Sequence, residues 1–431
     1  MREPGARGVQ GARQWGLRPG FVGAVRRRFA LAAALGVALP SLSPAAGGAA
    51  SSAPTPPSVP ATAWILVDAG DGTRLASLEP TRSLPMASTT KLMTAYLALR
   101  ELPLQRRLVA PPYHSIPGES LLGLEAGERI SVRDLLYGLL LPSGNDAAVT
   151  IADGVAGSVP AFVGEMNRAA GRLGLRDTSY ANPIGLDEPG NYSSPRDLAK
   201  LALDLRRDRL FRRIVDTPRK ALRTGSHPRT VVSRNDLLGR VSWVNGVKTG
   251  YTSDAGNVLV ASGTRKGATL LSVVMGAPTE TARDDDTRTL LRYGFSLYRR
   301  KTPVQRGERL AAPAVRGRDE ALPLVAGRSV QVTARQGQSV RVRIDAPRQV
   351  RGPIPRGRRL GVAVVSVDGE VAGRTALLSK HPALAPASPS LLSRVDNAVP
   401  GPRAVVWAAA GVAAVAIVIG IVLALSRRRR Y

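Results

Sequence analysis

The C-terminal end constrains this chain most, because it contains a long uncharged segment. From Ala404 to Leu425 there are 22 consecutive residues without a charged side chain. An apolar stretch of about 20 residues is long enough to cross the hydrocarbon core of a bilayer as one helix. Arg427 to Arg430 follow, and positive residues favour the cytoplasmic side. The sequence therefore predicts a single-pass cell-membrane protein, with a transmembrane helix at 404–425, a basic cytoplasmic tail at 426–431 and the remainder outside the cytoplasm.

The N-terminus is typical of a secretory signal peptide. Three arginines at 26–28 precede an apolar run from Phe29 to Leu39, and small residues continue through Ala45 and Ala46. This order of basic, apolar and small residues predicts a signal peptide over 1–46 that is removed on export. The Ser-, Pro- and Ala-rich residues 47–60 have little to bury, so we expect a linker there.

The charge of the chain raises the question of nucleic-acid binding. The formal net charge is +29, but the basic residues are spread along the chain and gather at its two ends. Aromatic residues make up only 4%, which leaves few side chains to stack on bases. We therefore expect no nucleic-acid partner and attribute the charge to an anionic envelope polymer or lipid surface. With no cysteine and three scattered histidines, we expect no metal site, and we expect no cofactor.

Residues 61–300 combine strand and helix signals and are expected to form one domain. Apolar runs at 63–67 and 75–78 flank a glycine-containing turn, which predicts a β-hairpin. Helices are expected at 89–100, 132–140, 146–155, 160–173, 195–206 and 281–298, and further strands at 247–249, 256–262 and 269–275. Strands from both ends of the segment around a helical middle predict an α+β fold, in which helices pack on one sheet.

The pattern changes between residues 304 and 378. Ser329–Thr333 and Ser339–Ile344 alternate polar and apolar residues with a period of two, which is typical of strands. We expect a small β-rich domain at 304–378 that acts as a spacer or interaction module, since it contains no chemical motif. The Pro-, Ala- and Ser-rich residues 379–403 are expected to tether it to the membrane helix.

Three short motifs occur in order within residues 61–300. They are Ser88-Thr89-Thr90-Lys91, Ser143-Gly144-Asn145 and Lys248-Thr249-Gly250, with first residues 55 and 105 positions apart. At a helix start, residues i and i+3 share a face, so Lys91 can reach the Ser88 hydroxyl as a general base. The Ser88 backbone N–H at a helix N-terminus is suited to stabilise an oxyanion. Each motif alone is common, but the three together predict acyl transfer with Ser88 as nucleophile.

Lysine is rare in this chain, which has seven lysines among its 61 basic residues. Two of the seven, Lys91 and Lys248, lie inside the motifs. Arginine is not deprotonated in proteins, so it could not replace Lys91 as a base. The use of scarce lysines at these positions favours a chemical role over a solvated surface.

The motifs resemble the signature of the serine-type D-Ala-D-Ala carboxypeptidases, the low-molecular-weight penicillin-binding proteins of the peptidase S11-like family. The similar segments are Pro85–Thr94, Leu141–Ala148, Asn182–Asp187 and Gly246–Thr252, and the resemblance covers about Ala61 to Tyr298. It implies a β-lactamase/penicillin-binding transpeptidase-like domain, a sheet with a helical cluster. The β-rich residues that follow are similar to the family's second domain.

By this resemblance, the protein would remove the terminal D-alanine from peptidoglycan stem pentapeptides through an acyl-enzyme on Ser88, and β-lactam antibiotics would inhibit it covalently. The catalytic residues implied are Ser88, Lys91 and Ser143, and the substrate-binding residues implied are Asn145, Lys248, Thr249, Gly250 and Tyr251. Ser143 would relay a proton to Lys91, and Asn145 would contact Lys91 and the substrate amide. Lys248 and Thr249 would hold the substrate carboxylate, and the Tyr251 N–H would complete the oxyanion hole. Many relatives have histidine in place of Tyr251.

Two other functions fit parts of the pattern. A β-lactamase-like penicillin hydrolase needs a Glu-x-x-x-Asn arrangement between the second and third motifs, and Glu188-Pro189-Gly190-Asn191 is one residue short of it. The second alternative is a non-catalytic, membrane-anchored envelope binding protein that keeps the fold. The intact nucleophile, base and carboxylate-binding lysine favour the carboxypeptidase.

Overall fold

The structure, a computed structural model, describes residues 54–385 and 402–427. The predicted signal peptide lies outside the described residues, as do residues 47–53 of the linker, 386–401 of the tether and 428–431 of the tail. The described chain begins with a five-stranded antiparallel sheet in the order β2-β1-β11-β10-β9. Its strands are β1 (Ala63–Asp68), β2 (Arg74–Leu78), β9 (Val244–Thr252), β10 (Gly256–Arg265) and β11 (Ala268–Ala277). All five predicted strands are confirmed.

Between β2 and β9 the chain forms a helical region. Its helices are η1 (Ala87–Thr90), α1 (Lys91–Glu101), α2 (Val132–Leu140), α3 (Asn145–Ala156), α4 (Val159–Leu173), α5 (Pro195–Leu205) and α6 (Arg209–Val215). Short strand pairs join them: β3 (Leu84–Pro85) with β6 (Tyr192–Ser193), β4 (Arg107–Val109) with β5 (Arg129–Ser131), and β7 (Arg219–Ala221) with β8 (Thr230–Val232). The predicted helices are confirmed, α6 was not predicted, and the first helix begins with the 3₁₀ turn η1.

Backbone hydrogen bonds hold the loop that carries the second motif. It lies between the end of α2, whose start is capped by Ser131, and the start of α3, which ends at Ala156 before the left-handed Gly157. The Gly144 N–H donates to the Gly138 carbonyl oxygen of α2, and the Asn145 N–H donates to the Ser120 carbonyl oxygen. The loop with Ser143 is therefore attached to α2 on one side and to the Ser120 backbone on the other.

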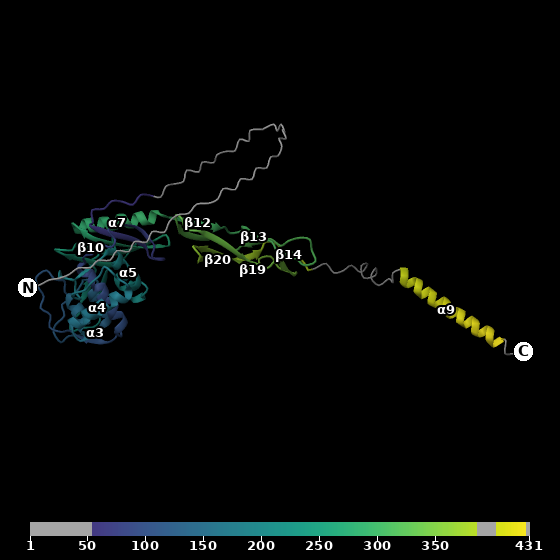
Figure 1. Cartoon of the computed structure of the whole chain (residues 1–431), viewed down its shortest axis with the longest axis horizontal. Coiled ribbons are helices and arrows are strands. Elements are labelled where there is room, and N and C mark those ends of the chain that lie inside the picture. Colours follow the sequence, from purple (N-terminus) through teal and green to yellow (C-terminus); the bar gives the residue numbers. More distant parts are fainter. Residues whose placement is uncertain (1–53, 386–401, 428–431) are drawn as a thin grey trace, which may run out of the picture. The chain divides into compact units, whose positions relative to one another are not determined.

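Both faces of the sheet are covered, which explains why its strands read as continuous apolar runs. Ile65 of β1 packs in the core of the helical region, whereas its neighbour Leu66 packs in a second cluster on the opposite face. That second cluster includes the buried Leu291 of α7 (Glu280–Ser296). Figure 1 shows α7 on one side of the sheet and α3, α4 and α5 on the other.

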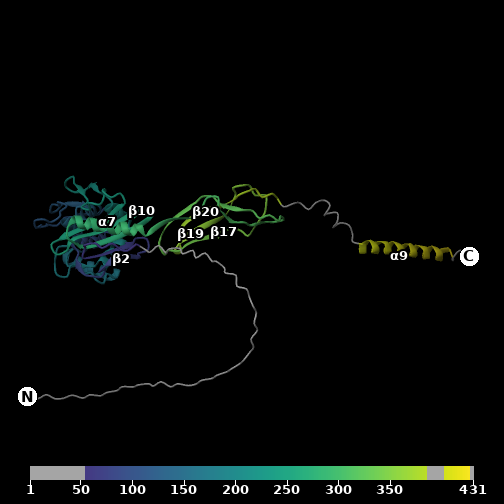
Figure 2. The same ribbon diagram turned by 90° about the horizontal axis from the view of Figure 1, so that it is seen from above.

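A β-rich part begins at β12 (Tyr298–Val304), so α7 ends earlier than the predicted residue 298. Its five-stranded sheet has the order β13-β15-β20-β19-β17. The strands are β13 (Arg309–Ala311), β15 (Leu324–Ala326), β17 (Val340–Asp345), β19 (Arg359–Val367) and β20 (Glu370–Ser379). In addition β12 pairs with β16 (Val330–Arg335), and β14 (Ala314–Val315) pairs in parallel with β18 (Gln349–Val350). Figure 2 shows β19 and β20 side by side, and β16 and β17 match the predicted period-two segments.

The last described element is the helix α9 (Pro402–Arg427). Within the described residues, no single helix meets the criteria of length and hydropathy for a membrane span, and the apolar stretch described in α9 is Trp407–Leu423. The bent pair of α3 and α4 meets the same criteria by length and composition only, and its apolar residues lie in the core. The transmembrane helix predicted at 404–425 is not confirmed.

Candidate active site

The three motifs meet at one cleft, although they lie far apart in the sequence. Ser88 of η1, Ser143 of the α2–α3 loop and Thr249, Gly250 and Tyr251 of β9 line a cleft of about 730 Å³. The other three residues to which the sequence analysis gave a role are buried beside this cleft, namely Lys91, Asn145 and Lys248. All eight residues singled out from the sequence therefore lie at the same place.

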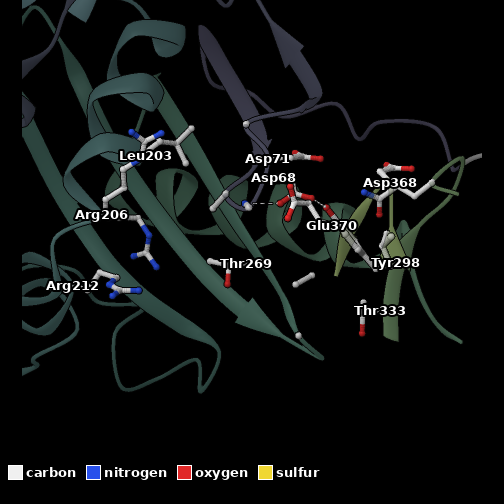
Figure 3. Close-up of a pocket in the computed structure, with 18 residues that line it drawn as sticks. Asp68, Asp71, Leu203, Arg206, Arg212, Thr269, Tyr298, Thr333, Asp368 and Glu370 are labelled. Carbon is white, nitrogen blue, oxygen red and sulfur yellow. Dashed lines mark hydrogen bonds between the residues drawn. The ribbon is translucent and has the colours of Figure 1, made fainter. Parts of the chain in front are cut away.

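A second pocket, of about 800 Å³, contains none of the motif residues. Figure 3 shows Arg206 and Arg212 on one side of this pocket and Asp68, Asp368 and Glu370 on the other. It holds charged groups of both signs but neither of the motif serines. Because acyl transfer needs a nucleophile, the motif cleft is the candidate active site.

The geometry between Ser88 and Lys91 suits a nucleophile and its base. Lys91 Nζ lies 3.0 Å from Ser88 Oγ, as the i, i+3 spacing predicts, and it also donates to the carbonyl oxygen of Ile184. Lys91 is completely buried, and loss of hydration disfavours its charged form. Burial lowers the pKa of Lys91 to about 7, although the carboxylates of Glu119 and Asp146 counteract this effect. The unprotonated amine, which is the state that a general base needs, is therefore accessible near neutral pH.

Two glycines allow neighbouring segments to approach the Ser88 backbone. A Cβ atom at Gly185, which has φ of +92°, would lie 2.0 Å from the carbonyl oxygen of Ala87. A Cβ at Gly250 would lie 3.1 Å from the Ser88 backbone nitrogen. Ala87 itself has φ of 47°, which is uncommon for a residue with a side chain. The Asn182–Asp187 segment and β9 thus both pack directly on the nucleophile turn.

Ser143 contacts the second buried lysine. Lys248 Nζ lies 3.0 Å from Ser143 Oγ and 2.8 Å from the Thr249 carbonyl oxygen. Burial lowers the pKa of Lys248 well below its ordinary value, and the positive charges of Lys91, Arg234 and Arg283 lower it further. The sequence suggested a relay from Ser143 to Lys91, whereas the structure places Ser143 against Lys248. Motif spacing could not distinguish these lysines, because both are buried at the same cleft.

Asn145 has a partner that no motif indicated. Its Nδ2 donates to Glu119 Oε2 at 2.9 Å, and the Tyr113 hydroxyl donates to the same oxygen. Glu119 and Tyr113 lie in the loop between β4 and β5, which is bound to the start of α3. There the Asp146 carboxylate accepts hydrogen bonds from three successive backbone N–H groups of the loop, those of Leu122, Gly123 and Leu124. This contact uses the amide nitrogen of Asn145, and the contact between Asn145 and Lys91 that the resemblance implied stays a prediction.

Sequence reasoning also missed the arginines that line the cleft, among them Arg234 and Arg283. The Arg283 side chain is only 2% exposed and pairs with Asp284. Arg234 donates to the Pro142 carbonyl oxygen beside the second motif. Because most basic residues of this chain are arginines, no signal in the sequence distinguished these two from the others.

The loop considered for a deacylating glutamate has a structural explanation. Glu188 Oε2 accepts a hydrogen bond from Asn182 Nδ2 at 2.9 Å, and the Asn191 side chain donates to the Leu186 carbonyl oxygen. Both contacts stay within the loop, and neither Glu188 nor Asn191 lines the active-site cleft. The geometry therefore does not favour the β-lactamase alternative.

Known proteins similar to this chain are D-alanyl-D-alanine carboxypeptidases. The family model for peptidase S11, D-alanyl-D-alanine carboxypeptidase, matches residues 50–279, more than half of the chain. D-alanyl-D-alanine carboxypeptidase DacC of Escherichia coli is 36% identical over 266 residues, 58% of this chain and 64% of the relative, so the match spans less than two thirds of that protein. D-alanyl-D-alanine carboxypeptidase DacD of Salmonella typhimurium is 37% identical over 283 residues, 63% of this chain and 71% of the relative.

The fold is also similar to a solved structure of penicillin binding protein 5 from Haemophilus influenzae. The match has a TM-score of 0.54 and 30% sequence identity, and it covers 76% of this chain and 98% of that chain. This confirms the penicillin-binding transpeptidase-like fold expected from the motifs. On the fold, the motif cleft and these similarities, the chain belongs to the peptidase S11 family of D-alanyl-D-alanine carboxypeptidases.

Proposed function

We propose that the protein is a serine D-alanyl-D-alanine carboxypeptidase that removes the terminal D-alanine from peptidoglycan stem pentapeptides through an acyl-enzyme on Ser88. One observation carries the proposal. The completely buried Lys91, with its pKa lowered to about 7, holds its Nζ 3.0 Å from Ser88 Oγ at the floor of the cleft. A nucleophile within hydrogen-bond distance of a base of matched pKa is what acyl transfer at neutral pH requires.

Acylation follows from this geometry. A neutral lysine amine has two N–H donors and one lone pair. When one N–H is donated to the Ile184 carbonyl oxygen, the lone pair can accept the Ser88 proton. As the proton moves to Nζ, Oγ forms a bond to the carbonyl carbon of the penultimate D-alanine. The backbone N–H groups of Ser88 and Tyr251 would stabilise the resulting oxyanion.

Ser143 is placed to protonate the leaving amine. Its Oγ accepts a hydrogen bond from Lys248, so its own O–H proton is available to another acceptor. Transfer of that proton to the amide nitrogen allows the C–N bond to break, and D-alanine leaves. The proton that Lys91 took from Ser88 then passes by way of Lys248 to Ser143 Oγ, which restores the Ser143 hydroxyl and the neutral Lys91 amine. A water molecule can then attack the ester while Lys91 takes its proton, and transfer of that proton to Ser88 Oγ as the ester bond breaks releases the shortened peptide and restores Ser88.

Substrate binding is supported by the positive end of the cleft. Arg234 and Arg283 line it together with Thr249, and Lys248 is buried next to them. A C-terminal carboxylate binds well to such a group of donors. β-Lactams also carry a carboxylate beside the reactive amide, so we expect them to acylate Ser88 in the same orientation.

Two measurements test this proposal. A labelled penicillin should attach to the wild-type protein and not to Ser88→Ala, and the wild-type protein should release D-alanine from a D-Ala-D-Ala peptide. A label that persists in Ser88→Ala would disprove the role of Ser88. Acylation without D-alanine release would favour the envelope binding protein.

We also propose that α9 anchors the protein in the cell membrane, with the catalytic part outside the cytoplasm. Its large apolar side chains are exposed along the helix, among them Trp407, Val412, Ile417 and Leu425. A helix of 26 residues is about 39 Å long, enough to cross a bilayer with some tilt. A stop codon in place of Pro402 should move the exported protein from the membrane fraction to the soluble fraction. Retention in the membrane fraction would contradict this assignment.

A further inference from the structure

A groove lined by arginines lies in the β-rich part, away from any residue with an assigned role. Four arginines line this groove of about 430 Å³, and small apolar side chains form part of its wall; they are Arg328, Arg343, Arg359 and Arg374, with Val362, Val364 and Ala376. We call this feature the arginine groove.

Strand pairing places the arginine groove on the outer face of the five-stranded sheet. Arg343 of β17 lies opposite Val364 of β19, and Val364 lies opposite Arg374 of β20. The neighbours of Val364 along β19, Ala363 and Val365, are completely buried in the core. Because side chains alternate along a strand, Arg343, Val364 and Arg374 share the face turned away from that core.

The positive charge of the groove is not balanced by nearby carboxylates. Asp345 is the one carboxylate among its lining residues. None of the ion pairs between described residues includes any of the four arginines. Residues 299–380 contain 18 lysines and arginines but only six aspartates and glutamates. The rest of the β-rich part therefore does not neutralise the positive charge of the groove either. Like charges held together in this way favour an anionic ligand.

The spacing of the arginines indicates the kind of anion. Arg343 and Arg374 lie on strands separated by β19, and so about 10 Å apart. The four guanidinium groups offer more N–H donors than one phosphate can accept, whereas a chain with repeated phosphates can contact them in turn. The planar arginine side chain binds phosphate through two parallel hydrogen bonds. The valines between them can contact the uncharged parts of such a chain.

We propose that the arginine groove binds a phosphate-bearing polymer of the cell envelope. A concave groove lined by charged side chains accommodates a linear chain, which can enter it, better than a planar lipid surface, which would meet only the rims. Binding there would hold the enzyme among the polymers of the envelope without using the active-site cleft.

Inorganic polyphosphate of defined length is the probe for this proposal, with the full chain in a neutral detergent. The test variant is Arg343→Gln/Arg374→Gln, and the matched control is Arg351→Gln/Arg356→Gln, which removes the same charge from exposed residues outside the groove. We expect the groove variant to bind at least tenfold more weakly and the slope of log affinity against log salt to fall by about one to two. The control should change affinity less than twofold.

Two results would overturn the proposal. Equal weakening in both variants would mean that binding reflects only the diffuse charge of the chain. Binding to phosphatidylglycerol vesicles without binding to polyphosphate would assign the surface to lipid. Penicillin labelling of Ser88 at the wild-type rate in each variant serves as the control for folding.

A second inference concerns Glu119, and it rests on the proposed roles of Lys91 and Asn145. Glu119 Oε2 accepts hydrogen bonds from Asn145 Nδ2 and from the Tyr113 hydroxyl, and Glu119 Oε1 accepts from the Ile116 N–H. An ionised carboxylate can only accept hydrogen bonds. The Asn145 amide must therefore turn its nitrogen toward Glu119, which leaves its oxygen as the group that can accept from a substrate N–H.

The same carboxylate lies in the electrostatic surroundings of Lys91. The charged groups that act on Lys91 are Glu119 from the β4–β5 loop and Asp146 from α3, with Arg234 as the opposing positive charge. Lys248 of β9 is a further positive group close to Lys91. Of these groups, Glu119 counteracts the effect of burial on the Lys91 pKa most strongly.

We propose that Glu119 is a positioning residue, which orients the Asn145 amide and holds negative charge beside Lys91. Glu119→Gln should shift the acid limb of the pH profile for penicillin acylation to lower pH by roughly one unit, because Lys91 loses its proton more easily. Glu119→Asp keeps the negative charge, so the acid limb of its pH profile should lie at nearly the same pH as in the wild-type protein. Glu125→Gln in the same loop is the matched control, since Glu125 is 65% exposed and pairs with His227.

The outcomes separate this inference from the proposed function. If the wild-type protein is not labelled at Ser88, the proposed function fails. If the wild-type protein and Glu119→Gln are both labelled and their acid limbs coincide, the function stands and the role of Glu119 is refuted.

Discussion

Replacing Gly185 with alanine would put a methyl group against the backbone that presents the nucleophile. The added Cβ would lie 2.0 Å from the Ala87 carbonyl oxygen and 2.9 Å from the Ser88 nitrogen, so the nucleophile turn or the Asn182–Asp187 segment would have to move by about 1 Å to restore normal contact. A misplacement of this size near a reacting atom can reduce the rate by about 100-fold. We therefore expect Gly185→Ala to acylate about 100-fold more slowly.

Gly190 provides a matched control for the backbone cost. It has φ of +88°, close to the +92° of Gly185, but a Cβ there would meet nothing within 4 Å. Both substitutions therefore carry the same penalty for a left-handed residue, about 1 kcal/mol, and only Gly185→Ala adds a clash of roughly 1–3 kcal/mol. The difference between the variants isolates the contact with the nucleophile turn.

The assay combines stopped-flow acylation by a chromogenic β-lactam with thermal unfolding. Gly190→Ala should acylate at nearly the wild-type rate and have a Tm about 2–4 °C below that of the wild-type protein. Gly185→Ala should acylate more slowly than Gly190→Ala and have a lower Tm. Equal acylation rates in the two variants would refute the reasoning, because they would show that the Gly185 contact does not position Ser88.

Further expectations concern pH, stability and specificity. Since burial lowers the Lys91 pKa to about 7 and the base must be unprotonated, acylation should rise roughly tenfold from pH 6 to pH 8 and then level off; a rise that continues to pH 10 in a stopped-flow profile would contradict this. Arg229→Ala would leave the buried Glu128 carboxylate without its ion-pair partner and should cost about 3 kcal/mol in urea unfolding, whereas Arg168→Ala, in an exposed ion pair, should leave the urea midpoint nearly unchanged. Tyr251→His should change the acylation rate by no more than about twofold, because the side chain is 64% exposed and only the backbone N–H is assigned a role; a tenfold change would show that the side chain takes part.

The sequence predicted the sheet well because its central strands are buried on both faces. The largely apolar sequences of β1, β10 and β11 follow directly from that double burial. The short helix α6 (Arg209–Val215) was not predicted. Four of its seven residues are apolar and the other three are arginines, and seven residues are too few to show a helical period of apolar positions.

The active site was predicted only as far as its motifs extend. Ser88 and Lys91 are three residues apart, so local helix geometry determines their contact. Ser143 and Lys248 are 105 residues apart, and only the folded sheet decides which lysine Ser143 meets. No sequence motif indicated Glu119, because it lies in a polar loop. Its contact with Asn145 forms only where that loop packs against α3. Contacts of this range depend on tertiary packing that a local pattern does not encode.

The sheet order has a consequence for how the enzyme matures. β1 pairs with β11, so that Ala63 lies opposite Met275, and the entire helical region is inserted between these two strands in the chain. A pairing over more than 200 residues is slow to form and requires the C-terminal strands to be present. A growing polypeptide therefore holds Ser88 and Lys91 before β9 brings Lys248 to them. Reactivity toward penicillin would then mark the completion of folding, and an unfinished chain would remain unreactive.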